Sequence, residues 1–187
     1  MKRSATIAEK CKNELKSASL PMEHLTETLK LAYDEHSDAI FRYCYFKVSD
    51  REKAIDLTQD VFVKVWQYLL AGNQVENMKA LLYKVARNLI IDEYRKKKFD
   101  SLDTMSDAGF EPVDTGQLDT ISIVEAGLLV DRIKELPDAY SEVVFMRYVD
   151  DLSVKEIAEA LGENENNISV RIHRGLHKLK VTITQTP

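Results

Sequence analysis

The stretch from Leu152 to Lys180 constrains the fold most, because it carries the signals of two short helices joined by a tight turn. Ser153 and Glu156 have the spacing of a capping box, which begins a helix, and Gly162 supplies the residue that ends it. Asn164 is suited to cap a second helix. The apolar residues of that helix recur at helical spacing, on Ile168, Ile172, Leu176 and Leu179. This pattern predicts a helix-turn-helix.

The opposite side of the second helix is mainly polar and fits a DNA major groove. Asn and Arg form bidentate hydrogen bonds with adenine and guanine, and Val packs on a thymine methyl group. The residues predicted to contact DNA are Asn166, Asn167, Ser169, Val170, Arg171, His173 and Arg174. The alternative is an ordinary helical hairpin with a solvated polar face. His173 and His177 lie one turn apart without a third ligand near them, so we interpret them as facing DNA or solvent rather than a metal.

Composition and charge distribution predict an all-helical chain with two basic helices. The 187 residues include only six Gly and four Pro, which favours helices. The net charge of −5 argues against a protein that coats DNA indiscriminately. However, residues 79–98 carry +5 and residues 165–180 carry +3, whereas residues 99–130 carry −7. Two basic helices are therefore separated by an acidic tether; a single charge run is usually only a solvated segment, but two basic segments flanking an acidic one are less usual.

Other classes of protein are excluded by what the sequence lacks. It has no apolar run long enough to span a membrane, and its first residues lack the apolar core of a signal peptide, so a cytoplasmic protein without membrane insertion is predicted. Cys11 and Cys44 are expected to be reduced structural thiols. Without a catalytic triad, a phosphate-binding glycine loop or a metal cluster, we predict no enzymatic activity, no cofactor and no metal.

The helical patterning predicts two small domains. Residues 1–25 form an N-terminal extension, residues 26–98 a helical domain, residues 99–121 the acidic linker, and residues 122–187 the helix-turn-helix domain.

Two helices of the first domain have outward polar faces. On Arg51–Leu70 this face holds Asp56, Gln59, Asp60 and Val63, while Trp66 is interpreted as a core aromatic. A plain solvated acidic face near the helix start is the alternative. On Met78–Lys98 the outward residues suit a nucleic-acid backbone and are Lys84, Arg87, Asn88, Ile91, Arg95 and Lys98. Tyr83 and Tyr94 border this face and are expected either to stack on unpaired bases or to pack half-buried.

Three segments, in this order, resemble bacterial sigma factors of the extracytoplasmic-function group. AIDLTQDVFVKVW (Ala54–Trp66) resembles that family's helix for the clamp coiled coil of the largest RNA polymerase subunit. LLYKVARNLIIDEYRKKK (Leu81–Lys98) resembles its −10 promoter helix. The segment Leu136–Lys180 resembles the domain that reads the −35 element. The resemblance implies a dissociable RNA polymerase subunit that initiates transcription at specific promoters.

The resemblance also implies roles for particular residues. Polymerase binding is assigned to Asp56, Gln59, Asp60 and Val63. Contact with the −10 element is assigned to Asn73, Asn77, Lys84, Arg87, Asn88 and Arg95, with the loop Gly72–Asn77 forming a pocket for a flipped-out base. The implied partners are the largest and second-largest subunits of core polymerase, promoter DNA and an anti-sigma factor. Many relatives have a basic residue and then a small hydroxyl residue where this chain has Ser169 and Val170. The resemblance therefore does not give the −35 DNA sequence that this chain recognises.

Two rival functions make different demands on the chain. A response regulator with the same helix-turn-helix would require an α/β receiver domain, yet residues 26–98 show no strand pattern and no phosphoacceptor pocket. An adaptor that binds polymerase without reading DNA would not depend on Asn88 or Arg174.

Overall fold

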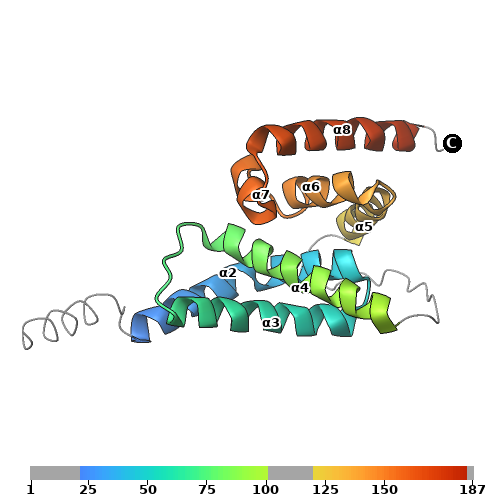
Figure 1. Ribbon diagram of the computed structural model, residues 1–187. Coiled ribbons are helices and arrows are strands. Elements are labelled where there is room, and N and C mark those ends of the chain that lie inside the picture. The colour runs from blue at the N-terminus through green and yellow to red at the C-terminus, as the bar shows by residue number, and fades with distance from the viewer. Residues whose placement is uncertain (1–21, 101–119, 185–187) are drawn as a thin grey trace, which may run out of the picture.

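The computed structural model describes residues 22–100 and 120–184. The predicted N-terminal extension lies mostly outside these residues, as does most of the predicted acidic linker. As predicted, the regular secondary structure of the described residues is helical, and Figure 1 shows the arrangement of the helices. The helices are α2 (Met22–Val48), α3 (Arg51–Leu70), α4 (Met78–Asp100), α5 (Thr120–Lys134), α6 (Asp138–Tyr148), α7 (Val154–Leu161) and α8 (Glu165–Thr184).

Helices α2, α3 and α4 pack on one another and form the N-terminal unit. Helix α3 begins at Asp50, whose carboxylate accepts a hydrogen bond from the backbone N–H of Lys53 at 3.1 Å. The side-chain oxygen of Asn77 accepts from the backbone N–H of Ala80 at 3.0 Å, in the same way, where α4 begins. The buried side of α3 has helical spacing and consists of Ala54, Leu57, Thr58, Val61, Phe62, Val65 and Leu69. Local sequence signals therefore set the start and the buried face of α3.

Helices α5 to α8 form the C-terminal unit, which contains the predicted helix-turn-helix. The capping box of α7 is present: the carboxylate of Glu156 accepts from the backbone N–H of Ser153 at 2.7 Å, and the Ser153 hydroxyl accepts from the backbone N–H of Glu156 at 3.2 Å. Gly162 ends α7 with a positive φ of 68°. Asn164 accepts from the backbone N–H of Asn167 at 3.0 Å, which caps α8. These local predictions are confirmed.

Helix α8 approaches α6 closely at Gly175. A Cβ atom at this position would lie 2.6 Å from Cγ2 of Val144 and 3.3 Å from Cβ of Tyr140. Val144 is fully buried, so it has little room to move away. The absence of a side chain at Gly175 therefore permits this helix contact.

We predict that Gly175→Ala lowers the free energy of unfolding by up to about 2 kcal/mol, because an overpacking cost of about 1–3 kcal/mol outweighs the gain of about 1 kcal/mol in helix propensity. Urea denaturation followed by circular dichroism measures the change. His177→Ala, on the exposed side of the same helix, serves as the control and should leave the midpoint nearly unchanged. An unchanged or raised midpoint for Gly175→Ala would contradict the prediction.

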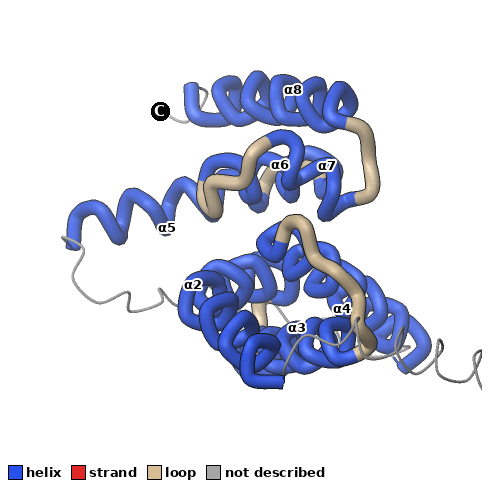
Figure 2. The backbone as a smooth tube through the Cα atoms, turned by 90° about the vertical axis from the view of Figure 1, so that its left-hand side faces the viewer, coloured by secondary structure: helices blue, strands red, loops and turns tan. Residues whose placement is uncertain are grey.

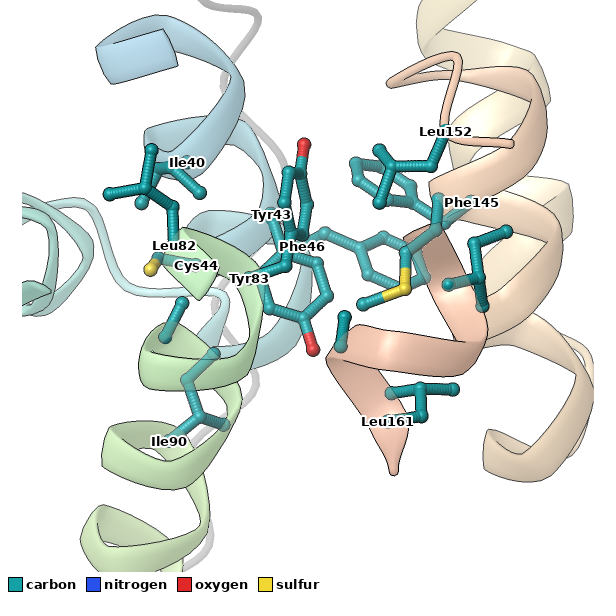
Figure 3. Packing of buried hydrophobic residues seen from close by; sticks show 14 of the residues in the cluster. Ile40, Tyr43, Cys44, Phe46, Leu82, Tyr83, Ile90, Phe145, Leu152 and Leu161 are labelled. Carbon is teal, nitrogen blue, oxygen red and sulfur yellow. The ribbon is translucent and has the colours of Figure 1, made fainter. Parts of the chain in front are cut away.

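The two units pack against each other, chiefly through α4 and α7. One continuous apolar core runs through both units. At its centre the ring of Phe46 stacks on that of Phe145 at 4.0 Å between centroids, and Tyr43 lies beside Phe145 (Figure 3). Helices α6 and α7 lie between α8 and the N-terminal unit (Figure 2). The sequence predicted two helical domains but not that they would share a core.

Of the helices in residues 22–100 and 120–184, none combines the length and the apolar character that crossing a membrane requires.

Candidate nucleic-acid interface

The outward face of α3 combines carboxylates with exposed apolar side chains. Asp56, Gln59 and Asp60 are exposed, and Val63 is 51% exposed, as predicted. Leu70, seven residues after Val63, is also exposed on this helix and was not predicted. Exposed apolar groups rimmed by polar ones are typical of protein-binding surfaces. The face is therefore suited to a protein partner, whereas the predicted core residue Trp66 is only half-buried.

On α4 the structure exposes most of the predicted cationic face. Lys84, Asn88 and Arg95 are exposed, and Arg95 lies 3.6 Å from Asp92. The prediction that the Arg87 side chain faces solvent is wrong in this arrangement. Its Nε is buried without a hydrogen-bond partner and lies 3.6 Å from a carboxylate oxygen of Glu142 on α6. The reason is that the C-terminal unit covers this side of α4, which helical spacing alone does not reveal.

Tyr83 and Tyr94, which border the cationic face of α4, differ in burial. Tyr83 is fully buried, which contradicts stacking on unpaired bases, the first of the two alternatives, and exceeds the half-buried packing of the second. Its ring packs against Tyr43 at 5.2 Å between centroids. Tyr94 is 46% exposed and its hydroxyl donates to the backbone carbonyl of Lys47, which agrees with half-buried packing.

The loop between α3 and α4 borders an open pocket of about 200 Å³. The two predicted asparagines help to shape this loop: Asn77 caps α4, and Nδ2 of Asn73 donates to the carbonyl of Tyr68 at 2.9 Å. Sequence reasoning did not find several lining residues, and one of them comes from α7 of the other unit. The lining residues are Tyr68, Gln74, Val75, Glu76, Asn77, Ala80, Leu81, Lys84 and Glu159.

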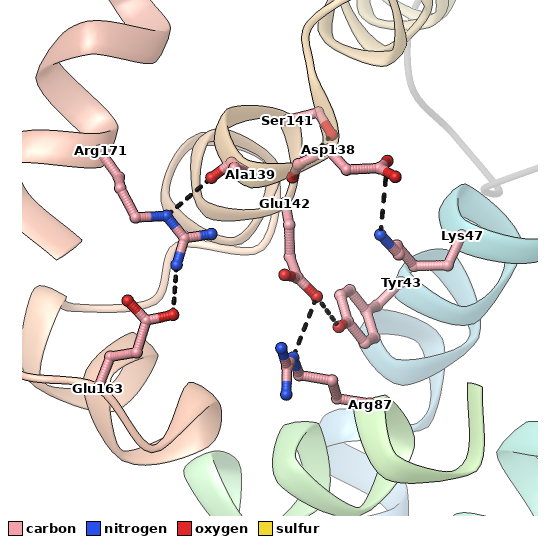
Figure 4. A network of polar contacts seen from close by, with 9 residues as sticks. All are labelled: Tyr43, Lys47, Arg87, Asp138, Ala139, Ser141, Glu142, Glu163 and Arg171. Atoms are coloured by element: carbon pink, nitrogen blue, oxygen red, sulfur yellow. Dashed lines mark hydrogen bonds and ion pairs between the residues drawn. The ribbon is translucent and has the colours of Figure 1, made fainter. Parts of the chain in front are cut away.

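Helix α8 presents its predicted polar face to solvent. The exposed residues are Asn166, Asn167, Ser169, Val170, His173 and Arg174. Arg171 differs, because its Nε donates to the carbonyl of Ala139 at 2.8 Å and its guanidinium pairs with Glu163 (Figure 4). These contacts tie α8 to α6 and to the turn before α8. The Arg171 guanidinium, which the sequence predicted to contact DNA, therefore makes contacts within the C-terminal unit.

A buried polar network joins the two units, and no part of it was predicted. The hydroxyl of Tyr43 donates to Glu142 at 2.8 Å (Figure 4). Nη2 of Arg42 donates to the carboxylate of Asp150 at 3.1 Å. Nζ of Lys79 donates to the backbone carbonyls that follow α6, those of Asp150 and Asp151, each at 3.1 Å. Buried carboxylates require such partners, because burial without them is costly.

Asp150 makes this interface sensitive to pH. Burial raises the pKa of its carboxyl group to about 6 from the ordinary 3.8, against the opposing influence of the nearby cations. The groups that face it are Arg42 and Cys44 from α2, and Lys79 and Tyr83 from α4. Because the pKa of Asp150 is higher in the folded protein than in the unfolded chain, the folded protein binds the proton more tightly. The resulting stabilisation is fully present below about pH 4 and is lost as the pH rises through about 6.

We therefore predict that Asp150→Asn, which stays uncharged, becomes more stable than the wild type as the pH rises from about 4 to about 7. A shift of about two pKa units corresponds to roughly 3 kcal/mol. Urea midpoints measured across this pH range test the prediction, with Asp131→Asn, at an exposed position, as the control. Parallel profiles for the wild type and Asp150→Asn would contradict it.

Among residues 22–100 and 120–184, no group of three or more His, Cys, Asp or Glu side chains is placed to hold a metal ion. His173 and His177 are both exposed. Cys44 is a buried free thiol, and burial raises its pKa to about 12, so the reactive thiolate is suppressed at neutral pH.

Comparisons with known families cover both units. Residues 32–99 match the family described as Sigma-70 region 2, and residues 126–179 match Sigma-70, region 4. The chain is 31% identical over 157 residues to the ECF RNA polymerase sigma factor SigW of Bacillus subtilis, covering 79% of this chain and 84% of that protein. It is 27% identical to the ECF RNA polymerase sigma factor SigL of Mycobacterium tuberculosis, covering 84% and 89%.

Solved structures show the same fold. The sigma factor RpoE of Bartonella quintana, in complex with the anti-sigma factor NepR, aligns with a TM-score of 0.67 and 20% identity over 89% of this chain and 100% of that chain. CnrH, in complex with the cytosolic domain of CnrY, aligns with a TM-score of 0.64 and 18% identity over 87% and 91%. The exposed basic face on α8, the fold and the sequence matches lead to one conclusion: the chain belongs to the ECF RNA polymerase sigma factors, non-enzymatic proteins that recognise promoters with RNA polymerase and initiate transcription.

Proposed function

We propose that this sigma factor divides its work among three helix faces: α3 binds core polymerase, α4 and the loop before it bind the −10 element, and α8 binds the −35 element. The observation that carries the proposal is the exposure of three chemically different faces. One is acidic and apolar, and two are basic with amide groups. Run-off transcription with purified core polymerase on a pool of genomic promoters tests it and reports the recognised sequences.

The α3 face is suited to a large, cationic protein surface. Asp56 and Asp60 lie one helical turn apart with Gln59 between them, and Val63 adds an apolar contact. We assign this face to the clamp of the largest polymerase subunit. We also propose that the protein contacts the second-largest subunit.

The α4 face supplies both charge and hydrogen bonds for the −10 element. Lys84 and Arg95 provide cations for phosphates, and the exposed amide of Asn88 provides a donor and an acceptor for a base edge. The pocket beside Tyr68 and Asn77 has room for a single base. Capture of unpaired bases there would favour strand opening.

The α8 face is suited to the major groove at the −35 element. Asn166 and Arg174 have the side chains that read adenine and guanine, and Val170, 47% exposed, fits a thymine methyl group. Arg171 holds α8 in position through Ala139 and Glu163. We therefore assign Arg171 a positioning role rather than a base contact.

We predict that Arg174→Ala weakens binding of the holoenzyme to a −35 duplex by roughly 5- to 150-fold, the effect of losing about 1–3 kcal/mol from one bidentate contact. Fluorescence anisotropy measures the dissociation constant. Arg132→Ala removes the same charge from α5, where the arginine pairs with Glu135, and should have little effect. Equal losses for both variants would mean that charge alone, rather than a base contact, explains the result.

We also propose that an anti-sigma factor sequesters this protein in the cytoplasm. RpoE and CnrH, which share its fold, were each solved in complex with a partner protein. The exposed apolar residues Val63 and Leu70 of α3 offer a surface that such a partner would cover. Purification of the tagged protein from its native cells, followed by mass spectrometry, tests this, and recovery of polymerase subunits alone would count against it.

A further inference from the structure

Two histidines lie one helical turn apart on the solvent-facing side of α8. His173 and His177 are both exposed, and at about 100° per residue they fall on the same face as Asn166 and Val170. Ile172, on the opposite side of the helix, is buried. The proposed −35 surface therefore contains two side chains of the type that changes its charge near neutral pH.

The charged side chains of α8 that lie nearest to the two imidazole rings are cationic. Arg174 follows His173 directly, and Lys178 and Lys180 follow His177 within one turn. Like charges one turn apart on a helix repel each other. In the free protein a protonated ring on this face therefore has neighbours of its own sign.

The elements that pack against α8 contact other parts of the helix or of the C-terminal unit. Their charged and titratable groups with a partner include Glu163 with Arg171, Tyr140 with Lys178, Arg132 with Glu135 and Lys134 with Ser49. Glu165 begins α8, about two turns before the nearer imidazole ring. These contacts bring no negative charge to either histidine.

Promoter DNA would supply the missing negative charge. A neutral imidazole ring has one N–H donor, whereas the protonated ring has two donors and a positive charge. Phosphates that border the major groove therefore favour the protonated ring over the neutral one. A histidine that contacts a phosphate thus takes up a proton as the DNA binds, and by linkage the affinity rises as the pH falls.

The size of the effect follows from the charge of the helix. Residues 165–180 carry a net charge of +3 with neutral histidines, which two protons raise to +5. Each phosphate contact steepens the decrease of log affinity with log salt concentration by about 0.9, so two contacts steepen it by about 1.8. Both increments are present at acidic pH and are lost at alkaline pH.

We propose that His173 and His177 are proton-dependent phosphate contacts of the −35 surface, so that the affinity of this sigma factor for its promoters rises as the surrounding solution becomes acidic. Arg174 keeps its charge throughout and supplies a constant part of the binding, whereas the histidines supply the variable part. The inference rests on the proposed binding of the −35 element by α8, and it adds His177 to that surface.

The test compares the wild type with the double variant His173→Gln and His177→Gln, in which the side chains stay polar but carry no charge at any pH. Fluorescence anisotropy measures binding of the holoenzyme to a −35 duplex between about pH 6 and about pH 8 at constant ionic strength. Titration of the polymerase cancels in the ratio of the two dissociation constants. Wild-type binding should tighten relative to the variant by at least about tenfold towards pH 6, since one linked proton contributes up to about tenfold per pH unit.

Three further variants isolate the cause. His24→Gln removes an exposed imidazole from the start of α2 and should keep the wild-type profile. His177→Lys introduces a permanent cation and should bind more tightly than the wild type at pH 8. Asp150→Asn, added to both proteins, removes the pH dependence of the contact between the units and should leave the difference between them unchanged.

Parallel pH profiles for the wild type and the glutamine variant would overturn the inference. So would a wild-type profile for His177→Gln alone, because His177 would then not contact the DNA. The salt dependence tests the phosphate contact itself: at pH 6 the wild-type slope should exceed that of the double variant by about 0.9–1.8. Equal slopes at pH 6 would exclude phosphates as the partners of the two rings.

Failure of the proposed −35 surface gives a different result. If Arg174→Ala leaves the affinity unchanged at both ends of the pH range, α8 does not bind the −35 element, and the proposed function fails together with this inference. If Arg174→Ala weakens binding at both ends while the glutamine variant follows the wild type, the −35 assignment stands and the histidine contacts alone are overturned.

Discussion

Replacing Asp56 and Asp60 by lysine is expected to abolish association with core RNA polymerase. Both side chains are exposed on the outward face of α3, so the change reverses the charge of the proposed contact without disturbing the buried face of the helix. Close charge pairs at protein interfaces couple by about 1.5–7 kcal/mol, and reversal turns attraction into repulsion. We expect affinity to fall by at least about 100-fold, measured by co-purification and by titration of labelled protein with core polymerase.

The matched control places lysines at Glu23 and Glu27, two exposed positions near the start of α2. This variant changes the net charge by the same amount, so any general electrostatic effect appears in both proteins. Circular dichroism should show unchanged helix content in each. Normal co-purification of the Asp56 and Asp60 variant, or equal loss in the control, would refute the assignment of this face to polymerase.

The combined change of Asn88→Ala and Arg95→Ala is expected to impair promoter melting severely. Each side chain is exposed on α4, and each proposed contact contributes about 1–3 kcal/mol, so their joint loss should reduce open-complex formation by roughly 30-fold or more. Permanganate reactivity of unpaired thymines in the −10 region measures opening directly.

A comparison with Arg174→Ala separates melting from binding. The α4 variant should reach normal occupancy of the −35 element yet show weak permanganate reactivity, because α8 is intact. Arg174→Ala should show reduced occupancy but normal reactivity once the holoenzyme concentration saturates the promoter. Normal reactivity in the α4 variant would remove Asn88 and Arg95 from the −10 site.

The helix-turn-helix was predictable because its determinants are local. Ser153 and Glu156 are three residues apart, and Gly162 and Asn164 act on adjacent helix ends. Such capping contacts depend on neighbours in the chain, and they form wherever the helix forms. The exposure of Asp56, Asp60 and Arg174 was predictable for a similar reason, since each falls opposite an apolar stripe.

The residues that were placed wrongly share a different cause. Periodicity indicates that one side of a helix is buried, but not whether a second side is covered by a distant segment. Tyr83 and Arg87 lie on such a second side of α4, next to the C-terminal unit. Arg171 likewise meets Ala139, which is 32 residues away in sequence.

The amino-acid sequence by itself therefore determined the helices, their ends, the helix-turn-helix and the three outward faces, because these follow from contacts within one or two turns. Only the tertiary structure decided that the two units share a core. That packing depends on pairs such as Tyr43 with Glu142 and Arg42 with Asp150, which are 99 and 108 residues apart. The partner of a buried carboxylate is fixed by the tertiary structure. The position of the carboxylate along the chain does not indicate which arginine or tyrosine will contact it.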